Sequence, residues 1–288
     1  MAVVRRRLDV ELVRRGLAES RTAAARLIGD GRVHVAGMPA TTSARRVEAG
    51  APIVVAGDGP QYVSRGGTKL AAALDAFSVS PADLCVLDAG ASTGGFTDCV
   101  LQRGARVVHA VDVGRGQLAW RIRQDPRVVV YERTNVRALD ATVLGTQVDL
   151  VIADLSFISL RTVAPALVAC ATPTADFVLL VKPQFEAGRA RVASGGIVRD
   201  PAVHAEVLSE VVGGLAEHDL FVVDIVASPI RGADGNREFF VRANRNRARI
   251  DDASLNIDVN FKPAFHNRLV TVPRGGSATG VELKVAPK

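Results

Sequence analysis

The chain has 288 residues, 48% of them hydrophobic, and a formal net charge of +6. This length allows one large domain and a small one, and no apolar run approaches the roughly 18 residues that span a membrane. The N-terminus lacks the long apolar stretch of a secretory signal, and Cys85, Cys99 and Cys170 form no disulfide framework. We therefore expect a cytoplasmic protein whose cysteines are small buried apolar residues.

Positive charge is concentrated at the start of the chain. The first fifty residues contain ten arginines, five acidic residues and no lysine, and they account for +5 of the net charge of +6. A charged run is often only a solvated face, but arginine concentrated in one small unit favours a surface that binds phosphates. The candidate contacts on this surface are Arg5, Arg6, Arg7, Arg14, Arg21 and Arg32.

Residues 5–56 are predicted to form a small α+β unit. Apolar residues recur at helical spacing in two stretches, and Ser20 is a candidate N-cap for the second. Two short apolar strands follow, separated by turn residues. The predicted elements are a helix from Leu8 that stops at Gly16, a helix over 21–28, and strands over 33–35 and 53–55.

From Ser64 onward, predicted helices alternate with strands, which is typical of a mostly parallel sheet with helices on both faces. The last two strands are short enough to form a hairpin at the sheet edge. The predicted strands are 84–88, 107–112, 128–131, 150–154, 177–182, 221–226 and 238–241, and the predicted helices are 68–77, 95–103 and 202–215.

Composition also suggests where the domains begin and end. We expect a first domain over 1–56, a linker over 57–63 that contains Gly and Pro, and a second domain over 64–245. Residues 246–288 show no sustained periodicity, so we expect a disordered tail there.

A glycine-rich turn, Asp88-Ala-Gly-Ala-Ser-Thr-Gly-Gly95, follows a predicted strand and opens a helix. Gly90 lets the backbone bend sharply and lets a ligand approach closely, and the helix N-terminus offers free N–H groups to a carboxylate. The turn lacks the GxGxxG pattern of nicotinamide-binding folds. An aspartate two residues before the first glycine instead suits the ammonium of S-adenosylmethionine, although such a turn can also be only a turn.

Asp112 ends the next strand, where a carboxylate can accept hydrogen bonds from the two hydroxyls of a ribose. The turn and this strand end together predict a nucleoside cofactor. The candidate cofactor contacts are Asp88, Gly90, Ser92, Thr93, Gly94, Gly95, Phe96, Asp112 and Asn135.

Polar residues also follow two later strands of the predicted sheet. Asp154 stands in Ala-Asp-Leu-Ser-Phe, which lacks the prolines typical of enzymes that methylate base nitrogens, and no cysteine suits methylation at cytosine C5. This pattern points to a hydroxyl acceptor, with a helix N-cap as the alternative role for Asp154. Lys182 follows a strand that should be buried on both faces, which puts its amine in the ligand crevice. Taken alone, Lys69 and Glu238 could each be a site residue or an ordinary surface residue.

Together, Lys69, Asp154, Lys182 and Glu238 match the Lys-Asp-Lys-Glu tetrad of the FtsJ/RrmJ-type ribose 2′-O-methyltransferases, which the second domain resembles. The first domain resembles the S4 RNA-binding fold in its Arg7-Leu-Asp9, Ser20-Arg21 and Gly31 positions. With Ser64-Arg-Gly-Gly-Thr-Lys-Leu70 at the join, the whole is similar to the TlyA family of rRNA methyltransferases. The sequence Gln61-Tyr62 departs from the Arg and Trp that close relatives tend to carry.

The resemblance implies an α/β protein, in which a small α+β S4 RNA-binding domain precedes a Rossmann-like class I methyltransferase domain with a seven-stranded, mostly parallel sheet. It implies S-adenosylmethionine as cofactor, no metal, and cytidine 2′-hydroxyls in 16S and 23S rRNA of ribosomal subunits as substrate, with no obligatory protein partner. The arginines of the first domain then become candidate RNA contacts.

A chemical hypothesis follows for the tetrad. A free lysine has a pKa of about 10.4 and is mostly protonated at neutral pH. A second cation and partial burial lower such a pKa, so we expect Lys182 to be the general base and Lys69 its cationic neighbour. Asp154 would orient Lys182 and the cofactor, and Glu238 would hold a lysine or the ribose.

Three alternatives remain open. A membrane-active protein is one, because the TlyA family has also carried a haemolysin label, although the basic unit does not resemble an amphipathic lytic helix. A second is an RNA-binding module whose methyltransferase domain is inactive, and a third is a ribose methyltransferase that acts on tRNA or another RNA.

Overall fold

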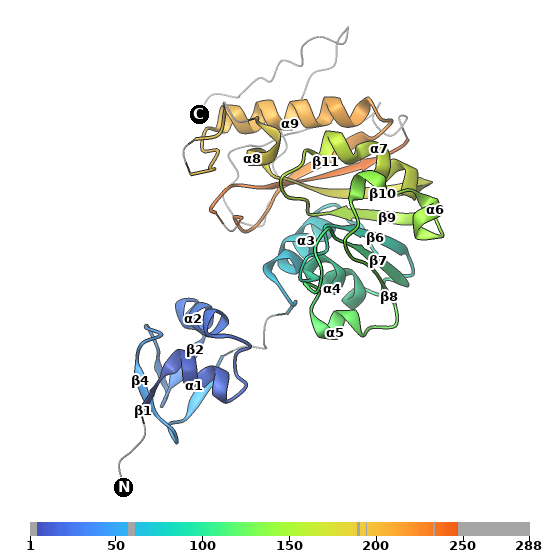
Figure 1. The fold of residues 1–288 in the computed structure, drawn as a ribbon. Coiled ribbons are helices and arrows are strands. Elements are labelled where there is room, and N and C mark those ends of the chain that lie inside the picture. Colours follow the sequence, from blue (N-terminus) through green and yellow to red (C-terminus); the bar gives the residue numbers. More distant parts are fainter. Residues whose placement is uncertain (1–4, 57–60, 189–190, 194, 233, 247–288) are drawn as a thin grey trace. The chain divides into compact units, whose positions relative to one another are not determined.

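The computed structural model describes residues 5–56, 61–188, 191–193, 195–232 and 234–246 (Figure 1). The chain divides into two compact units, Met1–Gln61 and Tyr62–Lys288. The expected tail beyond residue 246 and residues 57–60 of the expected linker lie outside the described part. The last two residues of that linker, Tyr62 and Val63, pack in the second unit.

The N-terminal unit is a small α+β fold around one apolar core. Its two helices pack on a three-stranded sheet of order β3-β2-β5 and a two-stranded sheet of β1 and β4. Ser20 accepts a hydrogen bond from the Ala23 N–H and so caps the second helix, as predicted. The elements are β1 (Arg5–Arg7), α1 (Leu8–Arg14), α2 (Arg21–Gly29), β2 (Val33–Val35), β3 (Met38–Pro39), β4 (Arg46–Glu48) and β5 (Ile53–Val55).

Strands β1, β3 and β4 of this unit were not predicted. Strands β1 and β4 are each three residues long and pair with each other, and their outward side chains are charged. A three-residue strand that is mostly arginine or glutamate has no apolar alternation, so its sequence does not predict a strand and only the pairing with another strand identifies it.

The second unit is a seven-stranded sheet of order β11-β12-β10-β9-β6-β7-β8, which confirms the predicted fold class. Five neighbouring strands are parallel, and β12 runs antiparallel to both of its neighbours. The strands are β6 (Cys85–Ala89), β7 (Val107–Val111), β8 (Val128–Tyr131), β9 (Val148–Ala153), β10 (Ala171–Val181), β11 (Phe221–Ala227) and β12 (Phe239–Asn244). The helices are α3 (Arg65–Ala76), α4 (Gly95–Gln102), α5 (Trp120–Arg123), η1 (Val136–Ala138), α6 (Ala141–Leu144), α7 (Leu160–Cys170), α8 (Pro183–Glu186) and α9 (Pro201–Ala216).

The predicted hairpin of the last two strands is confirmed as an antiparallel pair, β11 with β12. However, the later strand lies inside the sheet, because β12 also pairs with β10 and leaves β11 at the edge. This order makes the residue just before β12 a neighbour of the central strands.

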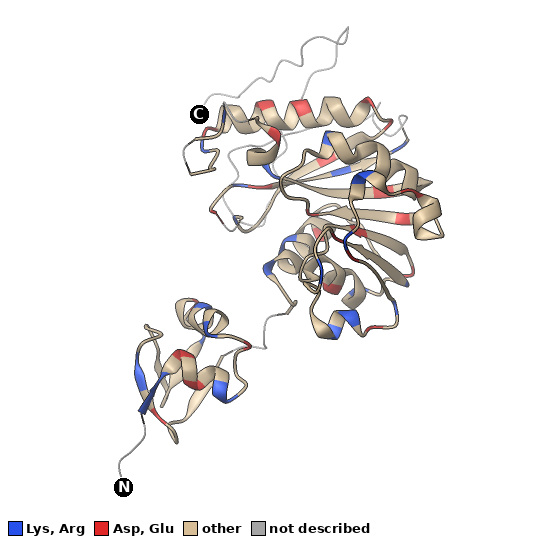
Figure 2. Cartoon of the chain, viewed as in Figure 1, with Lys and Arg blue, Asp and Glu red and all other residues tan. Residues whose placement is uncertain are grey.

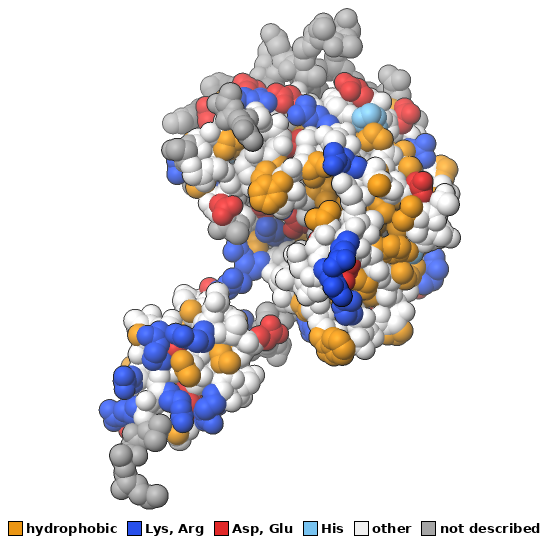
Figure 3. All heavy atoms as spheres, in the orientation of Figure 1, with side chains coloured by type: hydrophobic (Ala, Val, Ile, Leu, Met, Phe, Trp, Pro, Cys, Tyr) orange, Lys and Arg blue, Asp and Glu red, His pale blue; other side chains and the backbone are white. Residues whose placement is uncertain are grey.

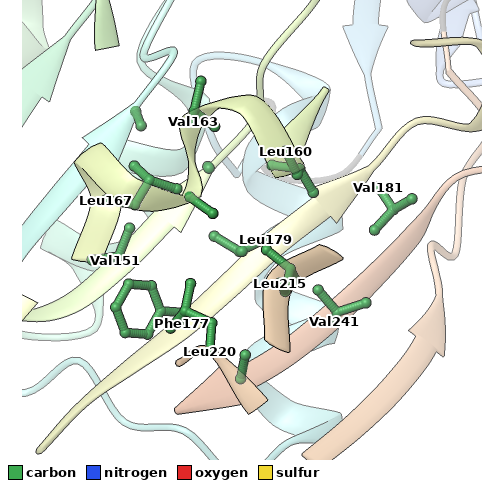
Figure 4. Close-up of a cluster of buried hydrophobic side chains, with 14 of the residues drawn as sticks. Val151, Leu160, Val163, Leu167, Phe177, Leu179, Val181, Leu215, Leu220 and Val241 are labelled. Atoms are coloured by element: carbon green, nitrogen blue, oxygen red, sulfur yellow. The ribbon is translucent and has the colours of Figure 1, made fainter. Parts of the chain in front are cut away.

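Two apolar layers cover the two faces of this sheet. Alternate residues of each strand contribute to opposite layers, so that Leu179 of β10 faces one and Val178 and Leu180 face the other. Helices α7 and α9 cover the first face, and α3 and α4 cover the second. Figure 4 shows the first layer, where side chains of α7 and α9 meet those of the strands: Leu160, Val163, Leu167 and Leu215 against Val151, Phe177, Leu179, Val181 and Val241.

Helix α7 was not predicted, although it is eleven residues long. Pro165 lies inside it, and its sequence is apolar on most sides. Its exposed positions are Thr162, Pro165 and Ala169, so its solvent face carries few polar side chains to mark it, and an internal proline argues against a helix.

The segment before and within α3 packs tightly on the start of α4. The backbone N–H of Val63 donates to Asp98 of α4 at 2.7 Å. Gly95, the first residue of α4, approaches Ser64 and the backbone of Gly67 too closely to leave room for a Cβ atom. The close approach of these two elements therefore depends on glycine on both sides.

Two adjacent glycines in α3 provide a matched test of how tightly Tyr62 packs against this helix. A Cβ atom on Gly67 would overlap the Tyr62 side chain, whereas one on Gly66 would meet its neighbours at 3.3 Å or more. We expect Gly67→Ala to lower the free energy of unfolding by about 1–3 kcal/mol through overpacking. Gly66→Ala should be close to neutral, and equal losses in urea denaturation for both variants would contradict this packing argument.

Candidate active site

The register of three neighbouring strands brings chemically active residues to one edge of the sheet. Ala153, the last residue of β9, pairs with Leu179 of β10, so Asp154 emerges beside the end of β10. Val181, the last residue of β10, pairs with Phe239, the first residue of β12. Lys182 and Glu238 therefore stand side by side just beyond the paired residues.

Two short ion pairs join the four tetrad residues. Lys69 Nζ lies 2.5 Å from Glu238 Oε2, and both side chains are at least nine-tenths buried. Lys182 Nζ lies 2.5 Å from Asp154 Oδ1, with the lysine side chain 12% exposed and the aspartate 24%. Each amine thus faces a carboxylate, as expected for Asp154 with Lys182, and the lysine that Glu238 holds is Lys69.

Residues that follow β9 and β10 complete the surroundings of Lys182, and the sequence analysis missed them. Lys182 Nζ donates to the Ser156 hydroxyl at 3.0 Å and lies 5.9 Å from the centre of the Phe185 ring. Phe157, whose ring lies 5.0 Å from that of Phe185, is 90% exposed and has a left-handed backbone with φ of 64°. Only the position of Phe157, three residues after Asp154, could have drawn attention to it.

Glu186 holds the loop that carries these residues. It is buried, and it accepts hydrogen bonds from the Ser159 hydroxyl at 2.5 Å and from the Leu160 N–H at 2.7 Å. Burial raises the pKa of this carboxyl. The loop between β9 and α7 is therefore bound at both ends, by Lys182 near its start and by Glu186 at its end.

The glycine-rich turn lies directly against the Asp154 backbone. Gly90 has φ of 90°, and a Cβ atom there would stand 2.5 Å from the Asp154 carbonyl oxygen. Gly94 also has a left-handed conformation and caps the N-terminus of α4, which begins at Gly95. The turn and Asp154 therefore form one continuous edge, and a larger residue at position 90 would push them apart.

Asp112 is bound to the turn by its side chain. Its two carboxylate oxygens accept from the backbone N–H groups of Ser92, at 2.8 Å, and Gly114, at 2.6 Å. A pocket lies beside these groups and combines apolar walls with carboxylates. It is lined by Ala91, Ser92, Ala110, Asp112, Gly114, Gln117, Leu118, Val130, Tyr131 and Glu132. The sequence analysis named only Ser92 and Asp112 among these residues.

Asp88 is completely buried at the end of β6. One of its oxygens, Oδ2, accepts from the Thr97 hydroxyl at 2.6 Å, and the other, Oδ1, has no hydrogen-bond partner among the described residues. Burial raises the pKa of this carboxyl to about 7, and the neighbouring charges of Asp154 and Asp112 act in the same direction. A buried acid with an unpaired oxygen is the kind of group that a cationic ligand stabilises.

The remaining candidate cofactor contacts have structural partners. Thr93 is exposed, and its carbonyl accepts from the Ala119 N–H. Asn135 is exposed and caps the short helix η1. The Phe96 ring is buried in the core against Phe240, with the ring centres 6.0 Å apart, so its side chain contributes packing to α4.

The six candidate arginines of the N-terminal unit are held by partners of their own unit. Arg5 pairs with Glu48, Arg6 with Glu11, and Arg32 donates to the Ala56 carbonyl. Arg7 and Arg21 both bind Asp9, and Arg14 binds Glu11. Figure 3 shows arginine side chains (blue) gathered in several groups over the visible face of this unit.

Sequence and structure comparisons place both units in known families. A family model described as FtsJ-like methyltransferase matches residues 62–245, and one described as S4 domain matches residues 6–53. Within the described residues, no helix combines the length and the apolar character needed to cross a membrane.

The relatives cover nearly all of both units. The 16S/23S rRNA (cytidine-2′-O)-methyltransferase TlyA of Mycobacterium tuberculosis is 52% identical over 247 residues, which covers 85% of this chain and 92% of the relative. Hemolysin A of Brachyspira hyodysenteriae is 38% identical, covering 81% and 97%. A solved structure from Streptococcus thermophilus that carries a hemolysin name is 38% identical, with a TM-score of 0.67 over 85% of this chain and 90% of that one. The chain therefore belongs to the TlyA family, in which an S4 domain precedes an FtsJ-like methyltransferase domain, and it is a methyltransferase.

Proposed function

We propose that the protein transfers a methyl group from S-adenosylmethionine to the 2′-hydroxyl of cytidine in 16S and 23S rRNA. The observation that carries this proposal is the Lys182–Asp154 ion pair, whose aspartate backbone lies against the glycine-rich turn at Gly90. An amine and a carboxylate beside a nucleoside-binding turn suit a hydroxyl acceptor. The name of the relative from Mycobacterium tuberculosis supports cytidine in rRNA as the substrate.

The residues beside the turn suit S-adenosylmethionine in charge and polarity. Asp112 and the apolar walls of the neighbouring pocket suit a ribose and a flat base. The unpaired oxygen of Asp88 suits the positive charge of the amino acid portion. When bound, S-adenosylmethionine supplies a methyl group on a positively charged sulfur.

The protein residues then have to bind and deprotonate the ribose hydroxyl. We assign to Lys182 the removal of the proton from the 2′-oxygen, and to Asp154 and Ser156 the orientation of its amine. Lys69, fixed by Glu238, places a second positive charge at this edge, which stabilises negative charge on the oxygen. Removing the Glu238 carboxylate would leave a buried lysine unpaired, which costs about 3–5 kcal/mol in comparable proteins.

Phe157 provides a platform for the base of the target nucleotide. A large apolar ring that is 90% exposed is unfavourable in water, and its left-handed backbone adds strain. Stacking on an RNA base would offset both the exposure of the ring and the backbone strain. In this arrangement the target nucleotide leaves its helix, so that its ribose reaches Lys182 while its base stacks on Phe157. The Phe185 ring lies 5.0 Å from the Phe157 ring at a tilt of 49°.

Replacing Lys182 tests the proposed proton transfer. We expect Lys182→Ala to lower kcat for methyl transfer to rRNA by about 100- to 10,000-fold, because general bases contribute rate factors of this size. S-adenosylmethionine binding, measured by isothermal titration, should change little. Arg106→Ala removes a 64% exposed side chain at the opposite end of the sheet and serves as the control. Loss of cofactor binding together with activity would instead assign Lys182 a structural role.

Asp88 generates a prediction about pH. The pKa of Asp88 is about 7 in the folded protein and 3.8 for an unperturbed aspartate, as in the unfolded chain. Between about pH 4 and pH 7 the folded protein therefore keeps a proton that the unfolded chain releases. The free energy of unfolding should therefore fall as pH rises from about 4 to about 7. Asp88→Asn removes this loss and should raise the ligand-free Tm relative to the parent protein most strongly above pH 7.

The same substitution should weaken S-adenosylmethionine binding above pH 7, because the carboxylate charge is lost. Scanning calorimetry and titration at pH 5 and pH 8 measure the two effects. A Tm difference that does not grow with pH would contradict the assigned pKa.

The role of Phe157 in binding the base can be tested by measuring KM for RNA and kcat separately. Because stacking on an aromatic ring contributes about 1–3 kcal/mol per base, we expect Phe157→Ala to raise KM for RNA about 5- to 100-fold. Phe157→Tyr keeps the ring and should behave like the parent protein. If both variants retain the parent KM, Phe157 has no part in binding the base.

A further inference from the structure

Two buried carboxylates organise the arginines of the N-terminal unit. Asp9 is 3% exposed and Glu11 is completely buried, and both belong to α1. Figure 2 shows these acidic positions (red) on the same helix as a basic one (blue). Acidic side chains are seldom buried without a specific partner, so the contacts of these two show what they do.

Asp9 binds two arginines through a fork on each. Arg7 Nε and Nη2 donate to its two oxygens at 3.0 Å each, and Arg21 Nε and Nη2 donate to Oδ2 at 3.3 and 3.1 Å. Arg7 is 46% exposed and Arg21 is 63% exposed, so both guanidinium groups remain at the surface.

Glu11 holds a second group in the same way. Arg14 Nε and Nη2 donate at 2.9 and 2.6 Å, Arg15 Nε donates at 2.8 Å, and Arg6 lies 3.8 Å away. Arg15 uses its other nitrogens for the carbonyls of Ala51 and Ala49. Arg15 therefore links α1 to the segment before β5, whereas Arg14 is 50% exposed at the surface.

The fork leaves one part of each surface arginine available. Among the described residues, Nη1 of Arg7, Arg14 and Arg21 has no hydrogen-bond partner, while Nε and Nη2 are occupied. Each such nitrogen carries two N–H groups that can bind a phosphate oxygen.

Both groups also keep a net positive charge. Asp9 is outnumbered two to one by its arginines and Glu11 three to one. Hydrogen bonds from Arg7 lower the pKa of Asp9 to about 2, and those from Arg14 lower the pKa of Glu11 to about 2. The carboxylates are therefore ionised throughout the physiological range.

We propose that Asp9 and Glu11 are positioning residues for RNA recognition, which hold Arg7, Arg21 and Arg14 in place so that their free nitrogens meet RNA phosphates. The inference rests on the proposed function, because it assumes that this unit binds RNA. A flexible arginine loses conformational entropy when it binds a phosphate, and an arginine already fixed by a buried carboxylate loses less. Two negative charges inside a phosphate-binding surface would then increase its affinity for RNA.

Replacing a carboxylate by the amide of the same shape distinguishes the positioning of the arginines from a simple change in net charge. Asp9→Asn and Glu11→Gln each remove one negative charge, and Glu48→Gln removes one from an exposed pair with Arg5. Electrostatics alone predicts tighter RNA binding for all three. We expect Asp9→Asn and Glu11→Gln in the full-length protein to weaken binding of a labelled 16S rRNA transcript about tenfold, with a less steep salt dependence. Glu48→Gln should bind as tightly as the parent protein or more tightly.

A second pair of variants protects the test against loss of folding. Arg14→Lys and Arg7→Lys keep the charge at half-exposed positions but cannot form the fork, and we expect them to weaken binding as well. If all four variants bind as tightly as Glu48→Gln, the carboxylates only neutralise charge and the inference is overturned. If the parent protein itself shows no salt-dependent RNA binding, the proposed function fails instead.

Discussion

The buried ion pair between Lys69 and Glu238 depends on the register of the central sheet, and this pair anchors one side of the candidate active site. Residues 169 positions apart meet because β12 inserts between β10 and β11 and so brings Glu238 next to Lys182. Helix α3 supplies the amine from the other side. Because a buried charge without its partner is strongly destabilising, this pair ties the α3 layer to the end of β12.

Close packing around glycine connects this region to the glycine-rich turn. The segment that begins α3 rests on Gly95, and Gly90 rests on the Asp154 carbonyl. Close backbone contacts therefore connect α3 to the start of α4 at Gly95, and the glycine-rich turn to Asp154 at Gly90. Such contacts leave little freedom for one part to move without the next.

Both units use carboxylates to hold cations, with different results. In the methyltransferase domain, the buried Glu238 and the partly buried Asp154 each fix one lysine. In the S4 domain, Asp9 and Glu11 fix several arginines whose free nitrogens remain at the surface. The first arrangement suits chemistry at one atom, and the second suits recognition of an extended, highly charged partner such as RNA.

The sequence by itself determined the elements with strong local signals, such as the parallel strands, the glycine turn and the helix behind Ser20, because hydrophobic periodicity and capping act over a few residues. It also determined which four residues form the tetrad, through resemblance to a family. Only the tertiary structure decided that Lys69 is the lysine paired with Glu238, that Phe157 is exposed beside the site and that Phe96 belongs to the core. These features depend on strand order and on contacts between distant segments, which local patterns do not encode.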